Sequence, residues 1–482
     1  MVDHRPIFQV VGLLLSMLGA FMMVPAIVDI LFGSSDWIVF FFSSIITLFF
    51  GVALWASSRG APPGLTIRQA FLMTNAVWVT LAAFGALPLY FSELELSYTD
   101  SFFESMSGLT TTGSTVIVGL DFAPPGILLW RSILQWLGGL GIIVMALAVM
   151  PMLQVGGMQL FKVEAFDTSE KILPRAAQIS GSMTLVYVAF TALCALAYDF
   201  NGMGSFDAVL HAMTTIATGG FSSRDASIGH FDSAAIDTVA IVFMIAGSLP
   251  FILFLKMAQG APLSFFRDSQ VRLFLATLFF FTTLACAYQI VANGVAFGPA
   301  IREGAFSVVS IMTGTGYANS DYYSWGPFAA VIFFIIMFIG GCAGSTSCGI
   351  KIFRFQVLIE NVRQHLKRIL FPHGIFPKMY NRKPLADSIV AAVMTFLFLY
   401  FLCVAVLAVL LSAVGLDTLT AFSASATAIS NVGPGLGEII GPAGNFASLP
   451  DAAKWLISAG MLIGRLELLT VLVLLVPRFW VR

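Results

Sequence analysis

Long apolar runs alternate with short polar connections along the whole chain. Each run holds about 20 residues, enough for a helix to cross the ~30 Å hydrocarbon core of a bilayer. The pattern predicts ten membrane spans, near residues 7–32, 37–58, 68–91, 127–150, 178–199, 235–257, 271–293, 327–357, 386–414 and 453–477. An even number of spans places both termini on the same side of the membrane.

Four of the connections contain an apolar segment that is too short to cross. A helix of about 11 residues covers only ~16 Å, so such a segment enters the membrane and returns on the same side. Each segment starts at an acidic residue (Asp100, Asp207, Glu303 and Asp417) and ends in Thr, Ser and Gly, at Gly113, Gly219, Gly316 and Gly433. A span precedes and another follows each segment. The chain therefore predicts a helix, re-entrant segment, helix unit present four times, after two extra helices.

The returning limb of such a segment limits what it can do. Its carbonyls lie at membrane depth, which is tolerated only where they are buried in protein or line a wet cavity. Four limbs around one axis would form a ring of carbonyls, the chemistry of a cation filter. The short helices would point the negative ends of their dipoles at a cation on the axis, and the acidic residues suit the positive ends. Close helix packing, for which small residues are also common, is the alternative.

Composition excludes a soluble protein. Of the 482 residues, 58% are hydrophobic and only 10% are charged, against roughly a quarter in soluble domains. We therefore predict an all-α polytopic membrane protein with four pseudo-symmetric helix–pore loop–helix repeats around one pore, preceded by two extra transmembrane helices. A net charge of −1 gives no support to nucleic-acid binding. The five cysteines have no metal-ligand spacing and are interpreted as packing residues.

The positive charges predict the orientation. With the N-terminus inside, 19 of the 24 Lys and Arg residues fall on the inner side, so both termini are predicted to be cytoplasmic. The five exceptions are Arg131, Arg224, Arg302, Lys454 and Arg465. Acidic residues favour the outer side, where they form either a cation-attracting vestibule or ordinary solvated loops.

These elements divide the chain into six parts. We expect an N-terminal helix pair at 1–66, repeats at 67–175, 176–266 and 267–358, a basic cytoplasmic linker at 359–384 and a fourth repeat at 385–482. Within the linker, 360–370 is predicted to form a short interfacial helix, and 371–384, rich in Pro, Gly and Asn, a turn. The linker charges fit either an ordinary inner loop or a docking surface for a cytoplasmic partner.

Two features at membrane depth stand out. Residues 340–349 in the eighth span are all Gly, Ser, Thr, Cys or Ala, which predicts either a loop or a closely packed kink. Lys351 follows and either anchors this segment or reaches the inner surface. Arg465 lies ~18 Å from either surface, where a cation is a functional hypothesis by default and a buried ion pair is the alternative. Glu467 points to another helix face and is not an obvious partner.

Two further polar residues allow two interpretations. Arg131 begins the second helix of the first repeat, and His211 sits within the second short segment. Each is either functional or a satisfied packing residue.

Seven motifs spread over nearly the whole chain carry a family resemblance. They are TTTGST at 110–115, ATGGFS at 217–222, TGTGYA at 313–318, NVGPG at 431–435, WRSILQWLGGLG at 130–141, GGCAGSTSCGIK at 340–351 and GRLE at 464–467. In combination they resemble the Trk/Ktr/HKT superfamily of potassium transport proteins, and within it the TrkH-like members.

The resemblance implies potassium uptake through one pore per subunit in a bacterial cytoplasmic (inner) membrane. The implied potassium-binding filter consists of Thr111, Thr112, Gly113, Thr218, Gly219, Gly220, Thr315, Gly316, Asn431, Val432 and Gly433. The implied gate is a loop across the pore, with Gly340, Gly341, Gly344, Ser345, Thr346 and Gly349, facing Arg465 as a barrier. Gly113, where some relatives have Ser, favours potassium over sodium.

The resemblance also implies partners. A homodimer embedded in lipid and a cytosolic nucleotide-binding subunit resembling TrkA are expected. The chain has no nucleotide-binding motif of its own, and we expect no bound cofactor, with potassium as substrate. Two other functions are weighed. A sodium-coupled potassium symporter of the same fold would need a second ion site, and an intramembrane hydrolase would need a catalytic set that the sequence lacks.

Overall fold

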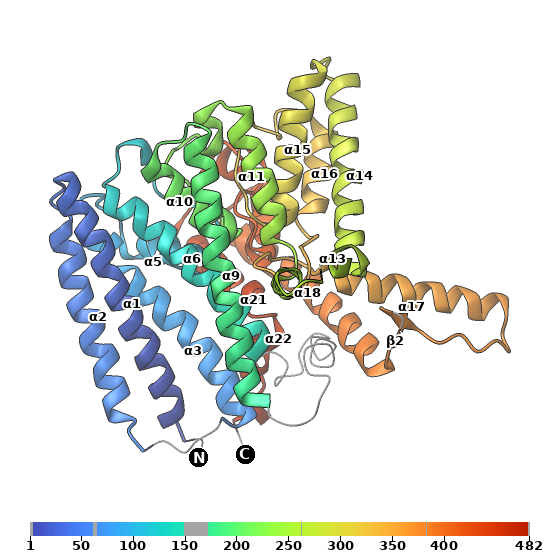
Figure 1. Cartoon of the computed structure of the whole chain (residues 1–482), viewed down its shortest axis with the longest axis horizontal. Coiled ribbons are helices and arrows are strands. Elements are labelled where there is room, and N and C mark those ends of the chain that lie inside the picture. Colours follow the sequence, from blue (N-terminus) through green and yellow to red (C-terminus); the bar gives the residue numbers. More distant parts are fainter. Residues whose placement is uncertain (1–2, 61–64, 149–171, 262, 382, 481–482) are drawn as a thin grey trace.

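The structure is a computed structural model that describes residues 3–60, 65–148, 172–261, 263–381 and 383–480. It is predominantly helical, which confirms the predicted fold class. The two extra helices, α1 (Arg5–Phe32) and α2 (Trp37–Ser57), pack along each other at one side of the bundle (Figure 1). Their contact is close because Gly12 and Gly51 abut backbone atoms of the facing helix, where a Cβ would collide.

The first two repeats follow the predicted order of helix, short segment and helix. Repeat 1 holds α3 (Ile67–Gly85), α4 (Leu87–Phe91), α5 (Tyr98–Leu109), η1 (Leu120–Phe122) and α6 (Pro125–Ala148). Repeat 2 holds α9 (Ile172–Phe200), α10 (Ser205–Ile216), η2 (Ser227–Phe231), α11 (Ala234–Gly247), α12 (Phe251–Ala258) and α13 (Leu263–Arg267). The end of the predicted span 127–150 and the part of repeat 1 from 149 to 171 lie outside the described residues.

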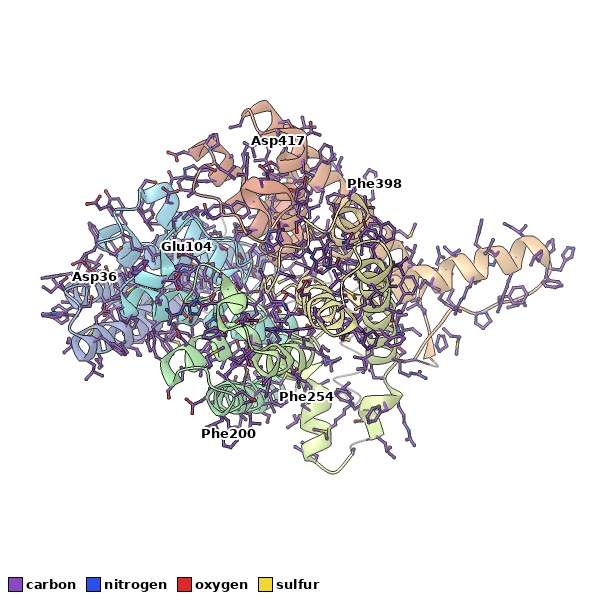
Figure 2. All side chains as sticks on the ribbon, turned by 90° about the horizontal axis from the view of Figure 1, so that it is seen from above. Asp36, Glu104, Phe200, Phe254, Phe398 and Asp417 are labelled. Atoms are coloured by element: carbon purple, nitrogen blue, oxygen red, sulfur yellow. The ribbon has the colours of Figure 1, made fainter. Side chains whose placement is uncertain are left out.

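The last two repeats are joined by a basic segment. Repeat 3 holds α14 (Ser269–Val291), α15 (Phe297–Thr313), α16 (Pro327–Ile336) and α17 (Ile352–Leu370), followed by a two-residue ladder of β1 (Met379–Tyr380) and β2 (Lys383–Pro384). Repeat 4 holds α18 (Asp387–Ala413), α19 (Thr418–Ser430), α20 (Gly437–Ile440), α21 (Asp451–Arg465), α22 (Leu469–Leu472), η3 (Val473–Leu475) and η4 (Pro477–Phe479). Seen from above, the four repeats follow one another around a common centre (Figure 2).

The ten predicted spans are not ten straight helices. Within the described residues, seven helices are long and apolar enough to cross a membrane. The sixth span is bent by 94° between α11 and α12, and the tenth by 108° between α21 and 469–475. The prediction of continuous helices there was wrong, because a buried chain can break where other backbone atoms take over its hydrogen bonds.

The eighth span ends earlier than predicted. Helix α16 stops at Ile336, and 337–351 form a loop; of the two interpretations of 340–349, the loop is confirmed. The helix expected over 360–370 starts instead at Ile352, so α17 has 19 residues. It runs sideways out of the bundle (Figure 1) and carries apolar and basic residues on different faces.

Several predicted boundaries shift. Those after residues 175, 266 and 358 fall inside α9, α13 and α17. The third short segment also starts earlier than predicted: α15 begins at Phe297, so Glu303 lies in its second turn rather than at its start. The two chain ends lie together (Figure 1), where Gln69 of α3 donates to the carbonyl of Asp3 and Phe71 packs on Phe479. This agrees with an even number of membrane crossings.

Candidate functional site

The four short helices end in the same backbone motif. The residue after each helix, or the next one, is left-handed: Thr111 (φ 50°), Thr218 (φ 50°), Gly314 (φ 74°) and Asn431 (φ 52°). The following N–H groups, of Thr112, Gly219, Thr315 and Val432, each donate to the carbonyl five residues earlier at 2.9, 2.9, 2.9 and 3.1 Å. This is a Schellman helix end, and it turns the chain back after each helix.

The motif sets the register of the repeats. Two residues after each left-handed position, φ is positive again, at Gly113 (88°), Gly220 (78°), Gly316 (81°) and Gly433 (109°). The counterpart of Gly113 in the second repeat is therefore Gly220 and not Gly219, which corrects the predicted alignment by one residue. The sequence offers two adjacent glycines there, and only the hydrogen-bonding pattern distinguishes them.

The four segments close into a ring. An added Cβ on Gly113 would collide with the carbonyl of Gly219, and one on Gly220 with that of Thr315. An added Cβ on Gly316 would likewise collide with the carbonyl of Val432, and one on Gly433 would lie 2.8 Å from the carbonyl oxygen of Thr112. Each repeat thus contacts the next, and the fourth contacts the first. Glycine is required because no side chain fits between the segments.

Most carbonyls of this ring have no hydrogen-bond donor. Within the described residues, no hydrogen bond ends on the carbonyl oxygens of Thr111, Thr112, Gly113, Thr218, Gly220, Thr315, Gly316, Asn431 or Val432. The Thr, Asn and Val residues of the ring are buried, and Gly113, Gly220 and Gly316 are partly exposed. Buried carbonyls without donors are rare in proteins, so this group is poised to accept a ligand such as a cation.

One cavity opens over the ring. It is lined by Gly113, Gly220, Gly316 and Gly433 from all four segments. The N-terminal ends of the short helices lie on this side, and the Asp417 carboxylate accepts from the backbone of Thr420 at the start of α19 (Figure 2). Hydrogen bonds from Thr420 hold the pKa of Asp417 below its ordinary value.

Four of the five cations that break the charge rule lie on this same side, in ion pairs. The pairs are Arg131–Glu104 at 2.8 Å, Arg224–Asp207 at 2.7 Å, Arg302–Asp237 at 2.7 Å and Lys454–Asp100 at 2.5 Å. Two of them join neighbouring repeats: Arg302 of repeat 3 to repeat 2, and Lys454 of repeat 4 to repeat 1. Their unusual location thus has a structural reason, since each neutralises a carboxylate at a helix start or contact.

The loop 337–351 lies directly against the other side of the ring. The hydroxyl of Thr346 receives a hydrogen bond from Thr218 at 3.2 Å, and the Cys348 sulfur lies 3.6 Å from the Thr111 hydroxyl. The loop fills the bend between α11 and α12, where Cys342 N–H donates to the carbonyl of Ser248 at 2.9 Å. Loop and bend therefore satisfy each other's backbone groups, which explains why both tolerate membrane depth.

Arg465 holds this loop. It is the last residue of α21 and is 4% exposed. Its guanidinium donates to the carbonyls of Thr346 at 3.2 Å and Gly138 at 3.3 Å, and contacts the Cys348 sulfur. A small cavity on this side of the ring is lined by Arg465, Asn431 and the loop. A fixed positive charge therefore lies against the loop, at a cavity that Asn431 of the ring also lines.

Two other charges support the loop region. The Lys351 ammonium donates to the carbonyl of Ser347, which matches the anchoring interpretation. Glu467 forms an ion pair with Arg354 of α17, not with Arg465. Along the sequence, Arg354 is simply one of the cations on the predicted inner side. Its partner is 113 residues away and comes close only because α21 ends at Arg465 and the chain bends there.

Sequence reasoning missed how the second segment is held. Arg131 donates to the Glu104 carboxylate and, at 2.7 Å, to the carbonyl of Ser222. One turn along α6, the Gln135 amide bonds Gly219 and Phe221. Arg131 and His211 both have buried hydrogen-bond partners, which fits the interpretation of each as a packing residue. The His211 ring bonds the Ser222 hydroxyl and the Asp207 carbonyl. The sign of this role in the sequence is that Arg131 is a cation on the predicted outer side.

A ring of carbonyls that mostly lack donors, with a cavity on either side, is an arrangement typical of membrane proteins that transport cations. Comparison with known proteins agrees. A family model described as TrkH, cation transport protein, matches residues 38–480. The chain belongs to this family, and it is therefore a transport protein and not an enzyme, which removes the hydrolase alternative.

Individual relatives match over their full length. The chain is 46% identical over 476 residues to the Trk system potassium uptake protein TrkI of Halomonas elongata, covering 98% of this chain and 96% of that protein. It is 39% identical over 483 residues to the Trk system potassium uptake protein TrkH of Escherichia coli, covering 99% of each. The crystal structure of the potassium transporter TrkH from Vibrio parahaemolyticus superimposes with a TM-score of 0.92 at 36% identity, covering 99% of this chain and 100% of that one.

Proposed function

We propose that this protein takes up potassium across the bacterial cytoplasmic membrane through a single pore along the axis of its four repeats. The observation that carries the proposal is the closed ring, in which most carbonyls accept no hydrogen bond from the described residues. Several relatives are named as potassium uptake proteins, which supports potassium as the transported ion. The membrane potential would drive uptake with ~2.3 kcal/mol per charge per 100 mV.

The ring is the proposed selectivity filter. Carbonyls of the three-residue segments 111–113, 218–220, 314–316 and 431–433 would replace the hydration shell of the ion. The four short helices end at the ring, so the negative ends of their dipoles face the ion. Gly314, which lies at the same position as Thr111 and Thr218, joins the predicted filter residues on this basis.

The loop 340–349 is the proposed gate, and Arg465 the barrier. The loop lies against the ring and is held by the Arg465 guanidinium. A cation that leaves the ring on this side meets both. Movement of the loop would remove acceptors of Arg465 and so shift its charge, which couples the loop to the barrier.

The partners follow from the family and the cationic linker. We infer a homodimer in which each subunit has its own pore, and a cytosolic nucleotide-binding subunit that docks on the face carrying the chain ends. Both termini lie on this cytoplasmic face in the proposed orientation, because most cations of the sequence fall on the same side.

The test is ion flux into liposomes that hold only the purified protein. Uptake of rubidium or potassium, competed weakly by sodium, is the expected result. Flux that requires sodium on the same side would favour the symporter instead. If neither potassium nor rubidium enters the liposomes, with or without the regulatory subunit, the pore proposal fails.

A further inference from the structure

Gln135 of α6 makes two hydrogen bonds to one segment of the ring. Its side-chain N–H donates to the carbonyl of Gly219 at 2.6 Å, and its side-chain oxygen accepts from the N–H of Phe221 at 3.0 Å. Gln135 is fully buried. Because the Phe221 N–H needs an acceptor, the orientation of the amide is determined by its two partners.

This contact distinguishes one repeat from the other three. The carbonyl of Gly219 corresponds to those of Thr112, Thr315 and Val432, each of which faces a glycine of the neighbouring repeat. Among the described residues, no hydrogen bond ends on those three carbonyls. Of these four equivalent carbonyls, that of Gly219 is therefore the one that accepts a hydrogen bond among the described residues, and its donor is Gln135 of α6.

The second helices differ in the same way. Gly138, Gly247 and Gly464 each abut the carbonyl two residues before a left-handed position, so they are equivalent. Three residues before them lie Gln135, Met244 and Met461. Of these three, only the first repeat has a side chain that can hydrogen-bond the ring through an amide.

The pair also explains a departure within the ring. Thr112, Thr315 and Val432 have side chains, whereas the second repeat has Gly219. A Cβ on Gly219 would lie 2.5 Å from the Gln135 side-chain oxygen, so the amide occupies the space of the missing side chain. Together with the bond from Arg131 to Ser222, α6 ties this segment at three points.

We propose that Gln135 is a positioning residue that determines ion selectivity by holding the Gly219 carbonyl in place. The proposal rests on the proposed function, in which the ring is the filter. A carbonyl held from behind cannot move inward to coordinate an ion smaller than potassium, and selectivity depends on the number and field of the carbonyls that reach the ion. The ring would thus have one rigid and three freer ligands at this level.

The experiment uses the full chain reconstituted in bilayers, with the potassium to sodium permeability ratio as the readout. Gln135→Met makes the first repeat resemble the second and fourth. We expect the ratio to fall about fivefold, the effect of one net hydrogen bond, while potassium flux persists.

Gly219→Ala reaches the same contact from the other side, because the Cβ displaces the amide. Gln289→Met, which removes a buried glutamine of α14 bonded to Asn293, is the matched control and should keep the ratio.

The double variant separates positioning from a general structural role. If Gln135 acts through Gly219, the two changes remove the same contact, and their effects on the ratio are not additive. Additive effects, or an unchanged ratio in either single variant, would overturn the proposal. Gly113→Ser in the same assay separates failure of the Gln135 proposal from failure of the proposed filter. If it lowers the ratio and Gln135→Met does not, the filter stands and the role of Gln135 fails; if neither does, the filter itself fails.

Discussion

At the scale of the residue, one charge is expected to control the rate. Arg465 is buried against the loop and lines a cavity together with Asn431 of the ring. At an effective dielectric constant of about 20, two unit charges ~6 Å apart repel by roughly 3 kcal/mol, about a hundredfold in rate if all of it appears in the barrier. We predict that Arg465→Ala raises flux without any partner and weakens control by the regulatory subunit.

Two variants sharpen this prediction. Arg465→Lys keeps the charge but loses the forked hydrogen bonds, so its flux should lie between those of Ala and the parent. Arg59→Ala removes an exposed cation in the turn after α2 that lies over the Trp55 ring, and it should leave flux unchanged. A folded Arg465→Ala protein that conducts no faster than the parent would make Arg465 a structural charge.

A second residue-scale prediction concerns the Cβ atom. Gly113 has a positive φ and faces the Gly219 carbonyl, so Gly113→Ser strains the backbone and pushes the ring apart. We predict lower potassium over sodium discrimination in a folded protein, measured as reversal potentials in mixed salts. Gly119→Ser is the control, because Gly119 has φ 79° but nothing within 4 Å of its Cβ position. Unchanged reversal potentials for Gly113→Ser would remove this residue from the filter.

At the scale of the element, the loop 340–349 should govern rate and not selectivity. A Cβ on Gly340 would collide with the Cys348 carbonyl, so Gly340→Val distorts the loop while leaving the ring sequence intact. We predict that Gly340→Val changes the rate of ion conduction and leaves the potassium to sodium permeability ratio unchanged, with both measured in bilayers. Gly298→Ala serves as control, because Gly298 in the first turn of α15 has no positive φ and nothing lies within 4 Å of its Cβ position. A changed ratio at an unchanged rate would mean that the loop is misassigned.

At the scale of the whole molecule, one ion pair joins α17 to the chain just after α21. Arg354 of α17 pairs with Glu467 beyond the bend after α21, and both are buried. Removing one partner of a buried pair costs about 3–5 kcal/mol. We therefore predict a lower thermal unfolding midpoint in detergent for Glu467→Gln.

The pairing itself is tested by combining variants. Arg354→Met with Glu467→Gln removes both charges and should restore part of the stability lost in either single variant. Stability losses that simply add in the double variant would show that the two charges act separately. Coupling would give the basic linker that begins with α17 a direct mechanical connection to the Arg465 region.

The sequence by itself determined the features that depend on length and local pattern. An apolar run long enough to cross a bilayer favours a helix, and a shorter one favours a segment that returns, so most spans and the four short segments were readable without any contact. The motifs around Gly113, Gly316, Gly433 and Arg465 could be located for the same reason.

Only the tertiary structure decided the features that depend on distant partners. Whether Gly219 or Gly220 matches Gly113 depends on a hydrogen bond back to the short helix and on contact with the next repeat. The bend after Gly247 depends on the loop 337–351, which takes over the backbone groups that the break exposes, and the bend after Arg465 is likewise seen only in the folded chain. The role of Gln135 likewise needs Gly219, which lies 84 residues away. Such pairings carry no local periodicity, so no pattern along the chain contains them.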